Sequence, residues 1–319
     1  MIRSPWFTAT LILVLAALAC SIPGMTGVDT GVVETQVALG IQQTGVAIQQ
    51  MTLAAPTLPP PAEAYTLAPD EEVVATTSAP VDMGARIKAS NILIYEDIVG
   101  DPSLLPIVTN TINYMNFSGG KIVNAGDGLG RFKEHANSAT KWDLMIVASE
   151  VRSVFTGEMF EMMYDHINSG GAVIIEVWDL DSFANGKIAP ILSKCGVSFH
   201  RDWWRDKKGW DPFSYSIYWL DKFHPLLSTP NTVPAPSYPY PTWFGDAGDL
   251  LKLGSGGDAV LVGGLHLDRK SDYGVLASCM GGRMVIQTFS SHDYKWDIIQ
   301  PLWENYITDT LTKHYEYAP

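Results

Sequence analysis

Basic residues and cysteine are scarce in this chain. Lys and Arg make up only 21 of its 319 residues, against 34 Asp and Glu, and the formal net charge is −13. Nucleic-acid binding needs a basic face, and adhesion to anionic lipid head groups needs a basic surface, so the composition argues against both. Solubility is the simplest explanation of this acidity, and binding of a cationic ligand or a metal ion is the alternative.

The common cofactor and metal motifs are also missing. No CxxC, HExxH or CxxCH pattern occurs, so structural zinc and attached haem have no support. The glycine cluster Gly126–Gly130 lacks the third glycine of a dinucleotide loop and a basic partner for phosphate. We therefore expect no cofactor and no metal. Besides Cys20, the only cysteines are Cys195 and Cys279, which form either a disulfide or two buried free thiols.

The N-terminal apolar run, Leu11–Ala19, is too short for a mature membrane span, which needs about 20 residues. Arg3 precedes it and small residues end it, a pattern typical of a secretory signal peptide. The residues before Cys20 resemble the lipobox of bacterial lipoproteins, although Ala17 stands where that family usually has leucine. This resemblance implies removal of residues 1–19, lipidation of Cys20, and an extracytoplasmic protein anchored to the bacterial cell membrane. An ordinary secreted protein and an uncleaved anchor are the alternatives.

A stalk and a spacer are expected between this anchor and the domain. Residues 20–53 are polar, and a sparse seven-residue apolar repeat in them is opposed by glycines, so a coiled coil has little support. Residues 54–85 contain six prolines among small and acidic residues, which indicates a disordered linker. The oligomeric state stays open.

From residue 86 to 319 the pattern is that of an α/β domain. Short apolar runs at 91–95, 121–124, 142–148 and 172–178 predict strands, separated by helical patterns that begin near residues 101, 156 and 186. Such alternation predicts a mostly parallel, doubly wound sheet with helices on both faces. Residues 200–250 read as an irregular, aromatic-rich insertion. A late β-hairpin over 275–289 and a last helix over 297–315 complete the prediction.

The order of these pieces resembles the class I glutamine amidotransferase-like superfold, most closely its trehalose-utilisation-type branch. The pieces that carry the resemblance are NILIYED (91–97), WDLMIVASE (142–150), AVIIEVWDLD (172–181), FHPLLSTPN (223–231), GRMVIQTFSSHD (282–293) and PLWENYI (301–307). This resemblance implies a flavodoxin-like arrangement of the domain.

One departure from the family bears on activity. In catalytic members a cysteine stands on a sharp turn after the strand that matches 172–178. This chain has Val177-Trp178-Asp179 there, without Cys, Ser or a flanking glycine. The resemblance therefore implies that the chain is not a glutamine amidotransferase, and we lean towards a protein that is not an enzyme.

Acidic residues follow the expected strands, and ligands of such sheets bind at the carboxyl ends of the strands. Binding through these acids, local capping of helices, and a catalytic pair for glycoside hydrolysis are the open alternatives. A hydrolase would use Glu150 and Asp179 or His292; His292 can also be a structural histidine. The acids proposed for binding are Glu96, Asp97, Asp127, Glu150 and Asp179.

Tryptophans gather in the segment after residue 200. Aromatic faces stack on sugar rings, so these residues either form one wall of a glycan site or hold the insertion together as a small core. They are Trp203, Trp204, Trp210, Trp219 and Trp243. The leading hypothesis is a lipoprotein that binds carbohydrate or a cell-envelope polymer. A carboxylate-dependent glycan hydrolase and a structural or assembly lipoprotein that binds another protein are the alternatives.

Overall fold

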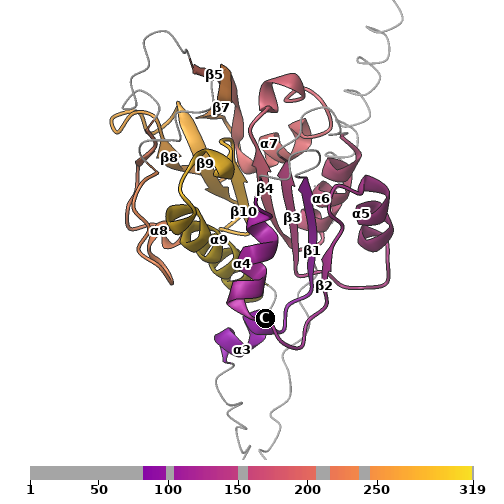
Figure 1. Ribbon diagram of the computed structural model, residues 1–319. Coiled ribbons are helices and arrows are strands. Elements are labelled where there is room, and N and C mark those ends of the chain that lie inside the picture. Colours follow the sequence, from indigo (N-terminus) through magenta and orange to yellow (C-terminus); the bar gives the residue numbers. More distant parts are fainter. Residues whose placement is uncertain (1–81, 98–103, 150–156, 206–215, 237–244, 318–319) are drawn as a thin grey trace, which may run out of the picture. The chain divides into compact units, whose positions relative to one another are not determined.

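The computed structural model describes residues 82–97, 104–149, 157–205, 216–236 and 245–317 (Figure 1). The predicted signal peptide, Cys20, the stalk and nearly all of the linker lie outside this range. Within the described residues, no helix has both the length and the apolarity needed to cross a membrane.

Five parallel strands form one half of the sheet. Their order is β2-β1-β3-β4-β10. Every residue of β1, β3, β4 and β10 is buried, as expected for strands covered on both faces. The first four lie close to the predicted runs. The bounds are β1 Ile92–Asp97, β2 Ile122–Asn124, β3 Leu144–Ser149, β4 Ala172–Val177 and β10 Met284–Gln287.

The other half of the sheet is antiparallel, which corrects the expectation of a mostly parallel sheet. From β10 the order continues to β9, β7 and β5, while β8 pairs with β9 and with β6. The bounds are β5 Val197–Arg205, β6 Tyr218–Trp219, β7 Gly245–Leu253, β8 Val260–Gly264 and β9 Gly274–Cys279. The predicted β9–β10 hairpin is confirmed, with Gly281 and Gly282 at positive φ.

The prediction of an irregular insertion over 200–250 is wrong at both ends of this segment, which form strands. Strands β5 and β7 pair antiparallel along their length and extend the sheet. Their register shifts between Phe199 and Arg201 and again between Asp202 and Trp204. A bulge adds an extra residue to one strand, which shifts the alternation between the two faces of the sheet. The sequence of β5 therefore lacks the period-two pattern by which strands are detected.

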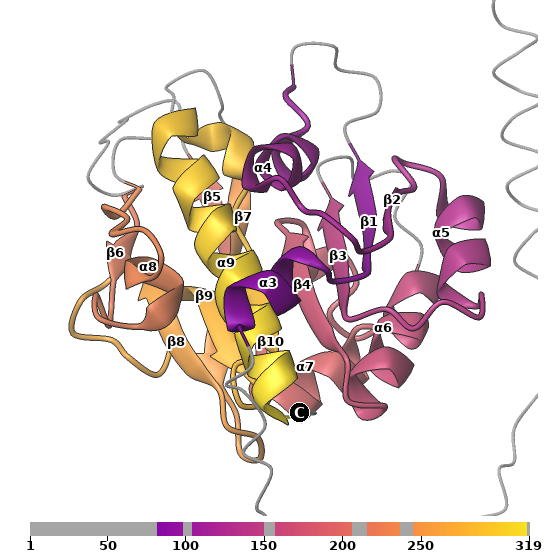
Figure 2. The ribbon, with the colours of Figure 1, turned by 90° about the horizontal axis from the view of Figure 1, so that it is seen from below.

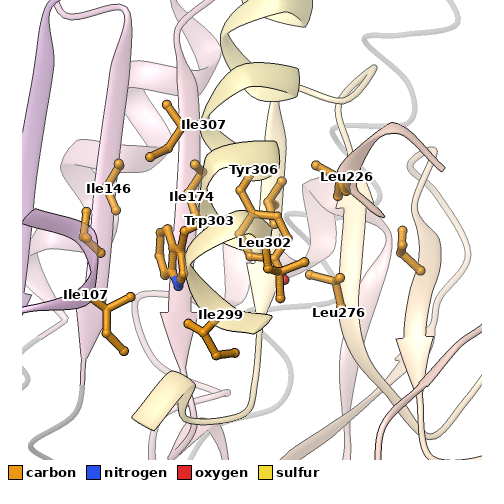
Figure 3. Packing of buried hydrophobic residues seen from close by; sticks show 14 of the residues in the cluster. Ile107, Ile146, Ile174, Leu226, Leu276, Ile299, Leu302, Trp303, Tyr306 and Ile307 are labelled. Carbon is orange, nitrogen blue, oxygen red and sulfur yellow. The ribbon is translucent and has the colours of Figure 1, made fainter. Parts of the chain in front are cut away.

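Helices cover both faces of the sheet, as predicted (Figures 1 and 2). On one face α3, α4 and α9 pack on alternate residues of the parallel strands; α9 crosses this face with Ile299, Trp303 and Ile307 buried (Figure 3). On the other face lie α5, α6 and α7. The helical bounds are α3 Met83–Lys88, α4 Ile107–Met115, α5 Leu129–Ala136, α6 Glu158–Asn168, α7 Ala189–Cys195, α8 Pro225–Ser228 and α9 Trp296–Tyr317, with short 3-10 turns η2 Leu180–Ser182 and η4 Ser291–Asp293.

Glycines follow two of the helices. Gly170 and Gly196, both at positive φ, lie at the ends of α6 and α7. The start predicted for α4 at residues 101–102 lies outside the described residues, and α4 itself begins only at Ile107. Helix α5 was not predicted, because it is short and mostly polar and Phe132 is its one buried residue, so its sequence shows no apolar face. The domain boundary predicted at residue 86 falls inside α3, whose N-cap is Asp82.

A disulfide joins Cys195 at the end of α7 to Cys279 at the end of β9. Both residues are buried, and their Cα atoms are 5.3 Å apart. Of the two possibilities left open by the sequence, the structure contains the bond and not the pair of free thiols. The bond joins the end of α7, which packs beside β5 and α6, to strand β9 in the antiparallel half of the sheet.

Candidate functional site

Three of the predicted acids reach the carboxyl edge of the parallel strands together. Glu96 and Asp97 end β1, and Asp179 follows β4 by two residues. In the strand register Asp97 lies level with Ser149 of β3, which lies level with Val177 of β4. Asp127 follows β2 in the turn before α5 and is exposed. Glu150 lies outside the described residues.

Glu96 serves the fold as a helix cap. Its side chain is buried and accepts hydrogen bonds from the backbone N–H of Val108 at 2.6 Å and of Thr109 at 3.1 Å, and from the Thr109 hydroxyl. Burial raises the pKa of Glu96, while these hydrogen bonds and nearby His292 oppose the rise. A carboxylate held this way satisfies the first turn of α4, which has no cap in its own sequence.

A second buried acid, Glu176, lies level with Glu96 across the sheet and was not among the predicted site residues. Glu176 of β4 accepts from the backbone N–H of Ser291 at 2.6 Å and from the Ser291 hydroxyl at 3.0 Å. That hydroxyl also accepts from Trp303 Nε1 and from the side-chain amide of Gln287. Burial and the charge of Glu176 raise the pKa of Tyr306, which donates to Gln287. This network connects α9 to the sheet.

On the opposite face of β1, Asp97 is fully buried beside the Tyr95 phenol. Burial raises the pKa of Tyr95, and the charges of Asp97 and Asp127 add to the effect. A tyrosine in these surroundings stays protonated, so its hydroxyl can donate a hydrogen bond. The carboxylates of Asp97 and Asp127 therefore lie near a protonated Tyr95 at the end of β1.

The turn after β4 is where the resembling enzymes carry their nucleophile. Here Trp178 and Asp179 are buried, and Asp179 accepts from the Ser182 hydroxyl at 3.2 Å. Two residues after Asp179, the backbone N–H of Asp181 donates to the carboxylate of Asp249 on β7 at 2.8 Å. An aspartate from the antiparallel half of the sheet thus holds this turn, and its side chains present no thiol or hydroxyl nucleophile at 177–179.

His292 lies in η4 and is fixed by backbone groups. Its Nε2 donates to the carbonyl of Leu105 at 2.7 Å, and its own N–H donates to the Ser290 hydroxyl at 3.2 Å. The ring lies close enough to Glu96 to affect the pKa of that carboxyl. Neighbouring Asp293 is buried. These contacts account for His292 as a structural residue that positions the segment before α4.

The tryptophans separate into buried and exposed members. Trp203 belongs to the core between the sheet and α9. Trp219 packs against the same core and donates from Nε1 to the carbonyl of Val233 at 2.8 Å. Trp204 of β5 is 63% exposed. Trp210 and Trp243 lie outside the described residues. Trp203 is buried and Trp219 is half-buried, and both pack against the core, which favours the core interpretation for these two residues.

The acids at this edge divide into buried residues engaged by the fold and exposed residues. The buried acids Glu96 and Glu176 each accept two or more hydrogen bonds from backbone and hydroxyl groups of the protein, so both carboxyl groups are engaged in contacts within the fold. Among the residues that the structure describes, no group of three His, Cys, Asp or Glu side chains could hold a metal ion. Exposed Asp127 and Asp181 remain accessible for hydrogen bonds to a ligand.

No protein-family model and no curated protein sequence matches this chain. Among solved structures, it is similar to a ThuA-like protein from Bacteroides uniformis, with 11% sequence identity and a TM-score of 0.40, over 69% of this chain and 91% of that chain. It is also similar to a ThuA-like protein from Parabacteroides merdae, with 10% identity and a TM-score of 0.38, over 68% and 87% of the respective chains. ThuA-like proteins are the trehalose-utilisation group that the sequence pieces resemble. At these identities and TM-scores the likeness carries no conclusion about activity, ligand or site.

Proposed function

We propose that this chain is an exported, lipid-anchored protein whose amidotransferase-like domain binds a carbohydrate or cell-envelope polymer. The signal-peptide pattern supports export, and Cys20 supports attachment to a lipid anchor. The Cys195–Cys279 bond supports an oxidising compartment, because such bonds persist outside the cytoplasm and are rare within it. The residues 177–179, without a nucleophile, support binding in place of amidotransfer.

The observation that carries the choice of ligand is the exposure of Trp204. An indole is costly to leave in water, yet Trp204 is exposed while its neighbour Trp203 is buried in the core. An exposed indole face is the surface on which a sugar ring stacks. The hydrolase alternative has less support, since Asp179 and His292 both hold local hydrogen bonds.

The test is binding of the purified full chain to a panel of bacterial and plant polysaccharides. We expect Trp204→Ala to weaken binding roughly tenfold, the loss expected for one aromatic stacking contact of about 1.4 kcal/mol. Phe223→Ala is the matched control, because Phe223 is also exposed, at 78%, but belongs to the loop before α8. Absence of binding to every polysaccharide, or equal binding by Trp204→Ala, would contradict the proposal.

A further inference from the structure

A cavity of about 240 Å³ lies between helices α8 and α9 and strands β8 and β9. Pro225 begins α8, Val260 begins β8, Ser278 lies on β9, and Asp309 and Lys313 lie on α9. The cavity is smaller than the pockets that hold drug-sized ligands, so a ligand of only a few non-hydrogen atoms fits it.

Asp309 is an unpaired acid in the wall of this cavity. It is 7% exposed, and its carboxylate accepts no hydrogen bond from any residue that the structure describes. Both of its oxygens keep accessible surface, and since Asp309 lines the cavity, a ligand there can reach them. Burial raises the pKa of Asp309 to about 6, so the carboxyl is mostly ionised at pH 7.5. A buried carboxylate without a partner costs stability, and such a residue in a cavity marks a candidate binding site.

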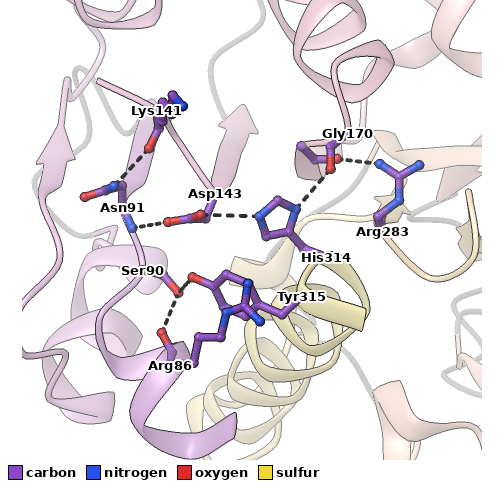
Figure 4. A network of polar contacts seen from close by, with 10 residues as sticks. Arg86, Ser90, Asn91, Lys141, Asp143, Gly170, Arg283, His314 and Tyr315 are labelled. Atoms are coloured by element: carbon purple, nitrogen blue, oxygen red, sulfur yellow. Dashed lines mark hydrogen bonds and ion pairs between the residues drawn. The ribbon is translucent and has the colours of Figure 1, made fainter. Parts of the chain in front are cut away.

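Contacts at the end of α9 hold Asp309 in this position. His314, five residues further along the helix, forms hydrogen bonds with the carboxylate of Asp143 at 3.3 Å and with the carbonyl of Gly170 at 3.0 Å (Figure 4). The hydroxyl of the next residue, Tyr315, forms a hydrogen bond with that of Ser90 at 2.8 Å. A rotation of α9 that exposed the Asp309 carboxylate to water would break these bonds.

The charges at the cavity favour a cation. Lys313 lies one turn after Asp309, but its ammonium pairs with Glu316 at 2.8 Å and not with Asp309. Burial lowers the pKa of His224, so its ring is neutral at pH 7.5. The two carboxylates of the lining, Asp258 and Asp309, against the one ammonium of Lys313 leave one net negative charge, and Glu316 beside Lys313 adds another.

The uncharged and exposed groups of the cavity can accept hydrogen bonds. Ser278 is 4% exposed, and its hydroxyl has no hydrogen bond with any described residue. The exposed Asp258 carboxylate is oriented by the backbone N–H groups of Met280 and Gly281, each at 2.6 Å. An ammonium group has three donors, for which Asp309 and Ser278 supply buried acceptors and Asp258 an exposed one. In the described part of the chain no three His, Cys, Asp or Glu side chains could hold a metal ion, so an organic cation fits better.

We infer that this cavity binds a small primary alkylamine in its ammonium form. The ammonium group donates to Asp309 and Ser278, and the alkyl chain packs on Pro225 and Val260, which line the cavity and are exposed. The inference goes beyond the proposed function and does not depend on it, because none of these residues belongs to the carboxyl edge of the parallel strands or to β5.

The test is titration of the purified full chain with matched probes at pH 7.5 and constant ionic strength, followed by saturation-transfer NMR. n-Butylamine carries the alkyl chain and the ammonium group. 1-Butanol keeps the chain with a neutral hydroxyl, and n-butyltrimethylammonium keeps the chain and the charge without N–H donors. We expect n-butylamine to bind about tenfold or more tightly than either of the other two probes.

Two variants separate this cavity from a general attraction of cations to an acidic chain. Asp309→Asn removes the charge without breaking a hydrogen bond between described residues, and should weaken n-butylamine binding about tenfold. Asp297→Asn makes the same change of charge at an exposed position in the first turn of α9, and should leave binding unchanged. No saturable binding of n-butylamine up to about 50 mM would overturn the inference. So would equal affinity for either of the other probes, or undiminished binding by Asp309→Asn.

Discussion

At the scale of single residues, the buried acids differ in whether the fold gives them partners. Glu96 and Glu176 accept several hydrogen bonds each. Asp309 of α9 is only 7% exposed, has no hydrogen bond from a described residue, and lines a cavity of about 240 Å³ with His224 and Lys313. Burial raises the pKa of Asp309 to about 6, while the charge of Lys313 partly opposes the rise.

Replacement of Asp309 by Asn should therefore stabilise the protein at neutral pH. The folded-state pKa lies above the unfolded value, so the protonated carboxyl favours folding at low pH. That contribution is lost as pH rises through about 6, and ionic Asp309 then costs at most about 3 kcal/mol. Asp309→Asn should raise the free energy of unfolding by about 1–3 kcal/mol at pH 7.5 and leave it unchanged at pH 4, measured by urea denaturation.

Asp258→Asn is the control from the same cavity. Its carboxylate accepts from the backbone N–H groups of Met280 and Gly281, each at 2.6 Å, so its removal should destabilise the protein. If Asp309→Asn were no more stable than the wild type at pH 7.5, the assigned environment of Asp309 would be wrong.

The site residues show how far single positions can be predicted from sequence. The grouping of Glu96, Asp97 and Asp179 at one edge followed from strand order alone. The commitment of Glu96 to α4 could not be predicted, because the N–H groups it accepts from lie twelve and thirteen residues away across a loop. The same holds for Asp143 and His314, which are 171 residues apart in sequence and meet only through the packing of α9.

At the scale of elements, the Cys195–Cys279 bond connects α7 with β9 across a sequence separation of 84 residues. Closing a loop of this length restricts the unfolded chain strongly, so we expect Cys195→Ser with Cys279→Ser to lower the free energy of unfolding by about 2–5 kcal/mol. Urea denaturation with and without reductant measures this change in the free energy of unfolding. Cys20→Ser should leave the midpoint unchanged. Equal midpoints in oxidised and reduced protein would contradict the assignment.

The elements with a simple period were predictable, and those shaped by bulges or by distant caps were not. Strands β1, β3 and β4 are nearly continuous apolar runs, and α6 shows its buried face as Phe160, Met163 and Ile167. In β5 the bulges break the alternation, and α5 buries only Phe132, too little to show a helical apolar face. Local sequence contains no signal for either.

At the scale of the whole molecule, the predicted membrane anchor depends on lipidation of one atom, the sulfur of Cys20. Cys20→Ala should move the protein from the membrane fraction to the soluble fraction of the producing bacterium, since lipid chains supply its membrane affinity. Cys279→Ala, a matched cysteine change, should leave the fractionation of whatever protein accumulates unchanged. Unaltered membrane retention of Cys20→Ala, together with no acyl label on the wild type, would contradict lipidation.

The covalent bridge between α7 and β9 also makes part of this chain a closed ring. Strands β5, β6, β7 and β8 all lie within that ring. A protease that cuts once anywhere between the two half-cystines opens the ring but releases nothing, because both pieces stay attached through sulfur. For a protein that we propose works among extracellular hydrolases, a single cut there would leave one covalent molecule.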